Sequence, residues 1–495
     1  MQRLPAVLGI MVAVLSGCLP ETRVTWSPDG RYALIRSADG LYLCDGDGKL
    51  SPRIAENVAA AAWTPDSRAF LAACVKPLST WDELLGHLSD ARKQTAQSEA
   101  SAFRQEILAY KGDWQKFSLS APSADIRAAL LCLRDQYGAE FAPVIGEPWS
   151  GLKALRHAAF RVQRFDVADG QAGPGKVLLE SLEPIAEIRV APTGKAFAYA
   201  APPYPALGAE AAFSLHVASF AAPDKVCRVA DRVSIFFDWT PDGGSVVFAQ
   251  ADTPDPQACG RRAALTSSER ALVYARDHMP ETYRQTAARL GRIVRAALLK
   301  ADGTVLESPE NTTLAWVPFF DSMPARCLRD GRVLFAAAGV QLPATEMPKG
   351  LSLFTVGLES PRKVEQVLTP EARNQVGERL HLMQLSPDET QVSIPGDALT
   401  VLNLATGQVT RVCQDPGAIL TTIPVWRSNR ELCFAVSHGS KLGSPDSDEI
   451  VLWSPADSRC LSKDWPRSVA GGLLPARAKP STGAPAPTSP APPAK

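Results

Sequence analysis

The side chains that could do catalytic chemistry are scattered along this chain of 495 residues. No two of its histidines stand at i, i+4, the spacing that places two metal ligands on one helix face. They are His87, His157, His216, His278, His381 and His438. The G-x-S-x-G turn that exposes a nucleophilic serine in hydrolases does not occur, and Gly439-Ser440 lacks its spacing. We therefore expect no catalytic residues and no enzyme activity.

Metal and cofactor sites are equally hard to find in the sequence. Asp45-Gly46-Asp47-Gly48 loosely matches a calcium loop with Glu56 in the twelfth position, but Lys49 and Leu50 stand where a ligand and a glycine are required. None of the nine cysteines after residue 18 belongs to a CxxC pair or to a Cys/His cluster with zinc spacing. They are Cys44, Cys74, Cys132, Cys227, Cys259, Cys327, Cys413, Cys433 and Cys460. Most lie in apolar runs and are expected to be buried thiols, although an exported chain could form disulfides.

One further cysteine has a chemically specific setting near the N-terminus. Arg3 precedes the apolar stretch Leu4–Leu15, which has the length of a signal peptide and is too short to span a bilayer. The stretch ends in Leu15-Ser16-Gly17-Cys18, which resembles the lipobox of bacterial lipoproteins. The resemblance implies cleavage after residue 17, a diacylglycerol on the Cys18 sulfur and acylation of the new amino group. An ordinary secretory signal with a chance cysteine is the alternative.

The lipoprotein resemblance implies a chain that is anchored in the cell envelope and faces the periplasm. Several acyl chains at ~0.8 kcal/mol per buried methylene anchor a protein stably, whereas one chain is marginal. Leu19 follows Cys18, and no aspartate stands there to favour retention in the inner membrane, so the outer membrane is favoured. Basic and acidic residues are equal in number, 52 of each, and this lack of a basic excess argues against a nucleic-acid partner.

A turn motif recurs along the chain and sets the expected fold. Its clearest copy is Trp26-Ser27-Pro28-Asp29-Gly30, followed by the β-prone run RYALI. Proline presets φ, the serine can bond the turn backbone and glycine fits the fourth position, so a type I turn between two strands is expected. The motif aspartates and tryptophans therefore have structural explanations. Further copies begin at Trp63, Val190, Trp239 and Leu385, and degenerate ones at Trp316, with its turn displaced to Asp330-Gly331, and at Trp426.

Each motif heads a short apolar run, and a second strand pair follows, as in a propeller blade of four strands. Uninterrupted copies are 37, 49 and 41 residues apart, near the roughly 40–45 residues of a blade. Over residues 24 to about 465 the pattern resembles the WD40-like repeats of the TolB C-terminal propeller and of prolyl-oligopeptidase-type propellers. We expect an all-β propeller at residues 18–467. Seven motifs predict seven blades, and six or eight are alternatives because two copies are degenerate.

Two gaps between motifs are too long for a blade and show helical patterns. Residues 77–159, within blade two, contain a capping box at Thr80–Glu83 that predicts a helix through about residue 110, followed by a second helix from about 123 to 138. Residues 252–290, within blade four, form the other insertion. Both follow the second strand of their blade, so both should emerge opposite the motif turns and pack on the propeller without full cores of their own. Such a face often binds partners, although the helices could also merely cover the blades.

Both ends of the chain add to this arrangement. Only residues 19–23 separate Cys18 from the first strand, so the face that carries the insertions should lie near the membrane. Residues 468–495 are rich in proline and alanine and are expected to form a disordered, solvated tail. The sequence thus predicts a lipid-anchored, non-catalytic scaffold that binds an envelope protein. A propeller that binds a small ligand or acts as an enzyme through its central channel, in the style of lactonases or dehydrogenases, is the alternative, and a purely structural envelope component is a third.

Overall fold

The structure is a computed structural model of the chain. It describes residues 22–37, 39–111, 125–145, 152–202, 213–251, 289–299, 305–320, 322–337, 351–360, 363–376, 379–396, 398–413, 418–420, 422–438 and 448–470. The predicted signal peptide with Cys18, nearly all of the predicted insertion at 252–290 and the tail beyond residue 470 lie outside the described residues. No helix of the described part is long and apolar enough to cross a membrane.

The motif turns are built by one recurring set of hydrogen bonds. Ser27 Oγ donates to Asp29 Oδ1 (2.6 Å) and accepts from the backbone N–H of Tyr32 (3.1 Å). Thr64, Thr240 and Ser386 repeat both bonds in their own copies. The fourth position has positive φ, which suits glycine at Gly30 (φ 69°) but is also adopted by Ser67 (φ 60°). The structural role predicted for the motif aspartates is confirmed.

The strands fall into consecutive groups, one for each motif copy, and the strand pairs of the described residues are antiparallel. Group one contains β1 (Val24–Trp26), β2 (Tyr32–Ser37) and β3 (Gly40–Asp45), and group two contains β4 (Val58–Trp63), β5 (Ala69–Leu78), β6 (His157–Ala168), β7 (Gln171–Ala172) and β8 (Lys176–Ser181). Group three contains β9 (Glu187–Val190), β10 (Ala196–Ala201), β11 (Phe213–Ser219) and the first part of β12 (Ala222–Trp239). Group four contains the last part of β12, β13 (Ser245–Ala251), β14 (Arg289–Leu299) and β15 (Val305–Phe319). Strand β12 pairs with β11 up to Val233 and with β13 from Val233 onward, which joins groups three and four into one sheet.

The remaining groups follow the same order along the chain. Group five contains β16 (Ala325–Cys327), β17 (Arg332–Ala337), β18 (Ser352–Gly357) and β19 (Val364–Gln366). Group six contains β20 (Gln384–Leu385), β21 (Gln391–Ile394), β22 (Leu399–Asn403) and β23 (Val409–Cys413). Group seven contains β24 (Ala418–Leu420), β25 (Val425–Trp426), β26 (Leu432–His438), β27 (Asp448–Trp453) and β28 (Ser458–Cys460). Short helices α8 (Pro370–Gln375) and η4 (Leu380–Leu382) connect groups five and six, and α9 (Arg467–Ala470) follows group seven.

The fifth motif copy corrects the sequence analysis. Trp316 lies in β15, the last strand of group four, and does not start group five. The turn of group five is formed by Leu328–Gly331, where the Gly331 N–H donates to the Leu328 carbonyl (3.0 Å), as the Gly30 N–H does to that of Ser27 (2.8 Å). Cys327 therefore occupies the position that tryptophan holds in the clearest copies. The predicted turn at Asp330-Gly331 before β17 is thus confirmed, and only the choice of Trp316 as the start of this copy was wrong, because Trp316-Val317-Pro318 resembled the start of the motif.

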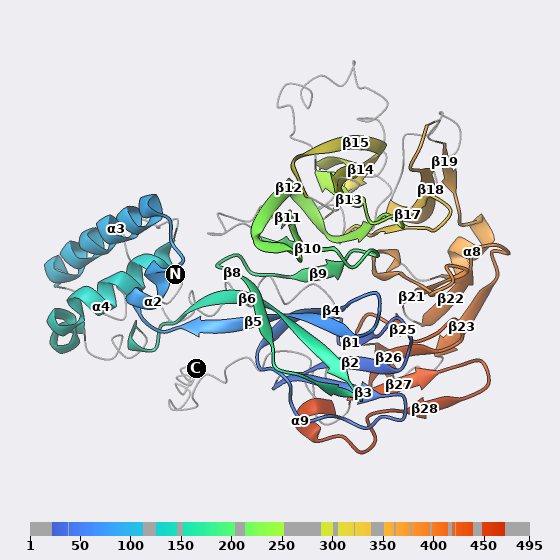
Figure 1. The fold of residues 1–495 in the computed structure, drawn as a ribbon, viewed down its shortest axis with the longest axis horizontal. Helices are drawn as coiled ribbons and strands as arrows, with labels where there is room; N and C mark the ends of the chain where they lie inside the picture. Colours follow the sequence, from blue (N-terminus) through green and yellow to red (C-terminus); the bar gives the residue numbers. More distant parts are fainter. Residues whose placement is uncertain are drawn as a thin grey trace, which may run out of the picture.

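The hydrophobic core is a series of clusters between neighbouring groups. Leu34 of group one packs in one cluster with Phe70 of group two, and Ile35 of group one packs in another with Ile450 of group seven. The last group thus lies against the first, as Figure 1 shows for β26–β28 and β1–β3. Small antiparallel sheets that follow one another around a closed ring define a β-propeller, and this confirms the predicted fold class.

The motif tryptophans join neighbouring groups in a polar as well as an apolar way. Each of three indole N–H groups donates to a main-chain carbonyl on the first strand of the preceding group. The pairs are Trp63 to Thr25 (2.9 Å), Trp239 to Arg189 (3.3 Å) and Trp426 to Gln384 (3.0 Å). The predicted packing role of these tryptophans between blades is confirmed.

Helices α2 (Trp81–Leu85), α3 (Asp90–Ala109) and α4 (Ile126–Ile145) form a helical arm between β5 and β6. The predicted capping box is present, because Thr80 Oγ1 accepts from the Glu83 N–H (3.2 Å) and the Glu83 carboxylate accepts from the Thr80 N–H (3.2 Å). The predicted first helix is broken at residues 86–89 into α2 and α3. The second helix was predicted to stop near Gly138, but α4 continues to Ile145.

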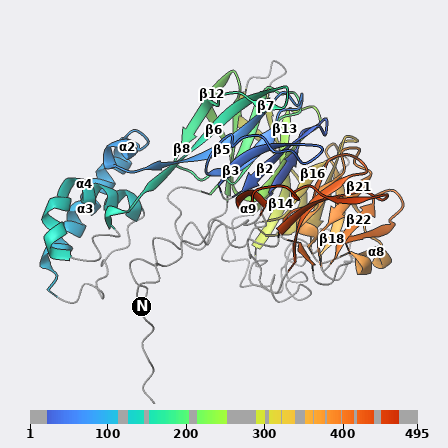
Figure 2. The same cartoon turned by 90° about the horizontal axis from the view of Figure 1, so that it is seen from below.

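The arm also corrects the expectation that the insertion would lack a core. Apolar side chains of all three helices form one buried cluster that includes Trp81, Phe103 and Leu131. This cluster meets group two only through residues such as Ala159 and Leu182 at its edge. Figures 1 and 2 show α3 and α4 beyond the end of the β5–β6 ribbon, away from the ring of sheets. A helix whose residues 128–133 are all buried needs neighbours on every side, and the other arm helices supply them.

Candidate functional site

The predicted lipidation residue, Cys18, lies outside the described residues, but the chain close behind it is described. Arg23 is 1% exposed and donates through Nη2 to the carbonyl oxygens of Val469 and Ala470 in α9 (2.7 Å to Ala470). Residues 468–470 were predicted to belong to the tail, whereas Val469 is buried and belongs to the folded ring. The start of the ring is therefore fixed to its end a few residues after the predicted anchor.

An arginine with little exposed surface closes the base of the helical arm. Arg134 of α4 has a side chain that is 9% exposed, and its Nε donates to Asp135 Oδ1 (2.6 Å). Its Nη1 donates to the Leu155 carbonyl (2.9 Å), and its Nη2 to the Ser79 carbonyl. Ser79 follows β5 and Leu155 precedes β6, so one guanidinium ties together the two segments that connect the arm to the ring.

A second polar contact joins the arm to the outer part of group two. The Glu180 carboxylate on β8 accepts from Arg161 Nε (2.7 Å) and lies 3.3 Å from Nε2 of His87, in the link between α2 and α3. Lys76 Nζ of β5 lies 3.9 Å from the same carboxylate. The arm is thus held at two points and has a defined orientation on the ring.

The outer face of α3 carries polar side chains without formal charge. Gln94, Gln97, Ser101 and Gln105 follow one line of the helix and are all exposed, whereas Phe103 faces the core of the arm. Nearby charged residues of α3 form ion pairs of their own, such as Arg104 Nη2 with Glu140 Oε2 (2.8 Å). A partner can desolvate uncharged side chains at lower cost than charged ones. This face is suited to a protein contact.

A charged cluster connects the first strands of groups three, four and five. Arg189 on β9 pairs with Asp238 on β12 (Nη1–Oδ1 3.2 Å) and with Glu187 (Nε–Oε1 3.3 Å). The second carboxylate oxygen of Asp238 accepts from the Cys327 N–H on β16 (3.2 Å). Arg326 lies beside this cluster and donates from Nη1 to the Phe237 carbonyl (3.4 Å).

The two arginines of the cluster are electrostatically unlike. Burial alone would lower the pKa of Arg189, but Asp238 and Glu187 outweigh it and raise that pKa. Burial, reinforced by the charge of Arg189, lowers the pKa of Arg326 to about 10, because the two carboxylates compensate only part of the cost. Both remain cations at neutral pH, but only Arg189 has close counter-ions.

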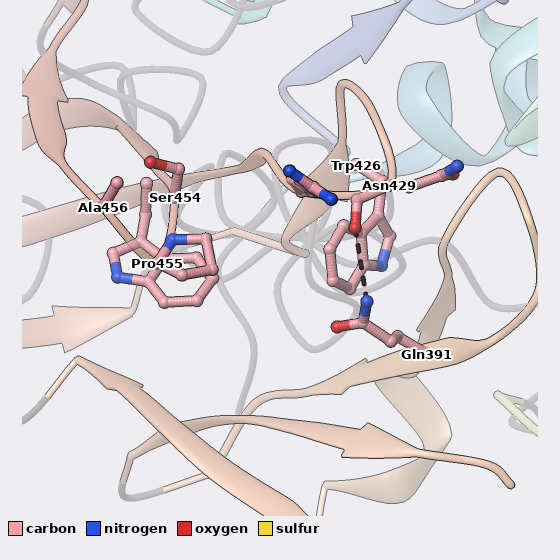
Figure 3. Close-up of a pocket in the computed structure, with 8 residues that line it drawn as sticks. Gln391, Trp426, Asn429, Ser454, Pro455 and Ala456 are labelled. Atoms are coloured by element: carbon pink, nitrogen blue, oxygen red, sulfur yellow. Dashed lines mark hydrogen bonds between the residues drawn. The ribbon is translucent and has the colours of Figure 1, made fainter.

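A groove opens between groups six and seven on the face of the motif turns (Figure 3). Its volume is about 390 Å³, and its wall contains a hydrogen bond from Gln391 Nε2 to the Asn429 carbonyl (3.3 Å). It is lined by Gln391, Trp426, Asn429, Arg430, Trp453, Ser454, Pro455 and Ala456. Arg430 is the only one of these that carries a charge, so the groove supplies surfaces for binding and no acid–base pair.

Among the residues that the structure describes, the histidines that the sequence analysis considered are not brought together. His216 lies 3.2 Å from Glu183 and stacks on Tyr199, His87 contacts Glu180, and His381 is partly buried beside Phe320. In the part of the chain that the structure describes, no three His, Cys, Asp or Glu side chains gather as metal ligands. The described cysteines Cys44, Cys74, Cys132, Cys227, Cys327, Cys433 and Cys460 are all free thiols, most of them buried as predicted.

The sequence analysis missed the charged cluster, although a signal for it was present. Arg189, Asp238 and Arg326 each stand directly before the first residue of a motif, on the first strand of their group. The equivalent residues of the other groups are Thr25, Ala62, Gln384 and Val425. Charged residues at this position in three successive copies could have been recognised once the fifth motif was placed correctly.

Comparison with known proteins gives structural matches only. No family model and no curated protein matches the chain. Among solved structures, it is similar to the β-propeller domain of the trilobed protease from Pyrococcus furiosus (8% identity, 87% of each chain covered, TM-score 0.41). It is also similar to TolB from Acinetobacter baumannii (13% identity, 60% of this chain and 57% of TolB covered, TM-score 0.35). The chain thus spans just over half of that TolB. Likenesses this distant carry no argument about function, and the propeller assignment rests on the sheets themselves.

Proposed function

We propose that this chain is a membrane-anchored, non-catalytic protein-binding scaffold of the bacterial cell envelope, built on a seven-bladed, TolB-like propeller. In this proposal the seven strand groups are the blades, lipid on Cys18 holds the chain at the periplasmic face of a membrane, favouring the outer one, and the helical arm binds an envelope protein. The observation that carries the proposal is the arm itself: it has its own core, a clamped base and an uncharged outer face.

The construction of the arm supports a binding role over a covering role. A segment that only shielded blade surface would lay its apolar side chains on the sheets, whereas these side chains pack against one another. Arg134 and Glu180 fix the base of the arm, so a partner on α3 would meet a preformed surface and lose little ordering entropy on binding.

The test is cross-linking in intact cells, followed by mass spectrometry. Leu78 and His157 are direct partners in the β5–β6 pair, so an Asn-Gly turn can replace residues 79–156 without shifting the register. We expect a discrete envelope protein to be captured by the wild-type chain and lost in this deletion. A purified sample of the deletion must keep its β-sheet circular dichroism, which shows that the ring still folds.

A surface variant separates binding from folding. Gln94→Arg, Gln97→Arg and Ser101→Arg place three charges on the outer face of α3, and capture should fall strongly. The matched control is Ala405→Arg, Gln408→Arg and Thr410→Arg at exposed residues near or in β23, and capture should persist. Equal capture by the wild type and the α3 variant would refute the arm as the binding surface.

A second candidate function is a propeller that binds a small ligand in its central channel. The charged cluster favours it, because polar groups from three successive strand groups converge there. The cluster contains paired arginines and carboxylates and no histidine, so it supports binding of a ligand more than acid–base catalysis.

A further inference from the structure

The residue directly before the motif lies on the first strand of each strand group, and first strands of neighbouring groups contact one another, β4 with β9, β9 with β12 and β12 with β16. Arg189, Asp238 and Arg326 hold this position in groups three, four and five, directly before the motif. Their contacts cross from one first strand to the next: Arg189 reaches Asp238, and Asp238 reaches the Cys327 N–H. In a propeller the first strands surround the central channel, so these side chains belong to its wall.

Within this wall the carboxylates are already engaged. One oxygen of Asp238 accepts from Arg189 and the other from the Cys327 N–H, while Glu187 pairs with Arg189. Each of these oxygens could accept a further hydrogen bond, but neither carboxylate lies within the ion-pair distance of 4.0 Å of the second guanidinium, that of Arg326. The cluster therefore satisfies Arg189 and leaves Arg326 without a close anion.

Arg326 uses little of its hydrogen-bonding capacity. A guanidinium has five N–H donors, and here one long bond of 3.4 Å reaches the Phe237 carbonyl. Its Cζ lies 5.6 Å from the centre of the Phe236 ring, which supports a flat guanidinium on one face. Among the described residues, no carboxylate lies within the ion-pair distance of 4.0 Å of this guanidinium. Arg326 is only 4% exposed, yet each of its side-chain nitrogens either has a hydrogen-bond partner or keeps some exposed surface in the described protein.

A cation held this way is unfavourable unless something supplies the missing negative charge. Burial and the neighbouring Arg189 both act against the charged form, and the pKa of Arg326 falls to about 10. Water at the channel side can reach the free donors only in part, because so little of the residue is exposed. An anion that enters the channel would gain charge-assisted hydrogen bonds to donors that are already in place.

We propose that Arg326 binds the carboxylate group of a small ligand in the central channel of the propeller. The fork of two guanidinium N–H groups matches the two oxygens of a carboxylate. Asp238 and Glu187 stand close by and would repel a doubly charged phosphate more than a singly charged carboxylate. This site is independent of the protein contact proposed for the arm, and either can fail alone.

The test measures acetate binding to the purified full chain at pH 7. Acetate replaces chloride at constant ionic strength, and binding is followed by saturation-transfer NMR on the acetate methyl and by the melting temperature. We expect saturable binding that raises the melting temperature of the wild-type chain. Arg326→Gln should weaken this binding at least tenfold, as expected for the loss of hydrogen bonds to a charged group. Arg68→Gln, at an exposed arginine on a motif turn, is the matched control and should bind acetate like the wild type.

Further outcomes decide the proposal. Equal acetate binding by Arg326→Gln and wild type, or no saturable binding by the wild type, would overturn it. Tighter binding of inorganic phosphate than of acetate would overturn the carboxylate assignment. If Arg326→Gln does not fold, Arg326→Lys keeps the charge and removes the fork, and unchanged acetate affinity in that variant would also overturn the proposal.

Discussion

The helical arm and the charged cluster each contain an arginine with little exposed surface, and the two arginines are used in opposite ways. Arg134 in the arm has a side chain that is 9% exposed, and all three of its nitrogens donate to protein acceptors, among them main-chain carbonyls on the segments that enter and leave the arm. Arg326 in the ring is 4% exposed and, among the described residues, has one long hydrogen bond to a carbonyl and no close carboxylate. The first arginine is a structural clamp, and the second has donors left for a ligand.

This difference shows that burial alone does not identify a functional charge. A buried arginine whose donors are all engaged offsets its desolvation within the protein and adds stability. A buried arginine whose donors are idle lowers stability and is explained by what it can bind. The two residues should therefore respond to substitution with opposite signs.

Arg134→Ala is expected to have the largest effect. It leaves two partly buried carbonyls without their donor and Asp135 without its counter-ion, so the arm should lose about 3 kcal/mol of local stability. Hydrogen exchange of the α3 amides measures this loss, and amides of β26 in the ring should stay protected. Arg104→Ala, which removes a partly exposed ion pair with Glu140, is the control and should cost less than about 1 kcal/mol. Equal exchange in both variants would remove the clamp from the account.

Arg326→Gln should act in the opposite direction when no anion is present. The variant removes a poorly compensated charge, so the free energy of unfolding should stay unchanged or rise by up to about 3 kcal/mol. Arg189→Gln is the paired experiment and should destabilise the ring, because Asp238 and Glu187 lose their counter-ion. Urea unfolding in chloride buffer measures both. A marked loss of stability in Arg326→Gln would place it with Arg134 among the structural arginines.

The pH dependence sharpens the same contrast. Because the pKa of Arg326 is lowered to about 10 in the folded chain, the unfolded chain binds more protons above that pH. The free-energy cost of keeping Arg326 charged in the folded chain is fully present below pH 10. It fades as the pH rises through 10 toward the pKa that an arginine has in the unfolded chain. The wild-type chain should therefore gain stability relative to Arg326→Gln across this window. A constant difference between the two unfolding curves from pH 8 to 10.5 would contradict it.

Trp63→Phe should have a moderate effect on the contact between groups one and two. It keeps most of the packing but removes the indole N–H that donates to the Thr25 carbonyl, and we expect a loss of about 1 kcal/mol. Trp453→Phe in the groove is the control, since the structure gives that indole no hydrogen bond to a described residue. Thermal unfolding of the two variants measures the difference, and equal melting temperatures would show that the indole bond contributes nothing.

The smallest effect is expected at a motif turn. The Thr64 hydroxyl, outweighing partial burial, lowers the pKa of Asp66, with further help from the Arg68 N–H. A lowered carboxyl pKa adds stability above the unfolded value of about 3.9, and this is lost as the pH falls through the folded value. Asp66→Asn should therefore cost less than about 1 kcal/mol at pH 7 and less still at pH 3. A cost that stays the same at both pH values would point to geometry and not to charge.

The fold was predictable because its determinants are local and repeated. The serine or threonine, the proline and the aspartate of the motif act within one turn, and several copies along the chain make the pattern secure. The capping box at Thr80 is local in the same way and was found at the predicted residues. In group five the turn was predicted at the correct residues, Asp330-Gly331, but the start of the copy was assigned to Trp316 because the tryptophan position holds Cys327, which resembles any other buried residue.

The sequence by itself determined the turns, the run of strands that they head and the position of the helical insertion in group two. Only the tertiary structure decided that the arm has its own core, that Arg134 is satisfied and that Arg326 is not. These properties depend on residues far apart in the chain, such as Ser79 and Leu155 around Arg134 or Asp238 and Phe237 around Arg326. A turn is encoded within five residues, whereas the environment of a charge is set by every strand that folding brings beside it.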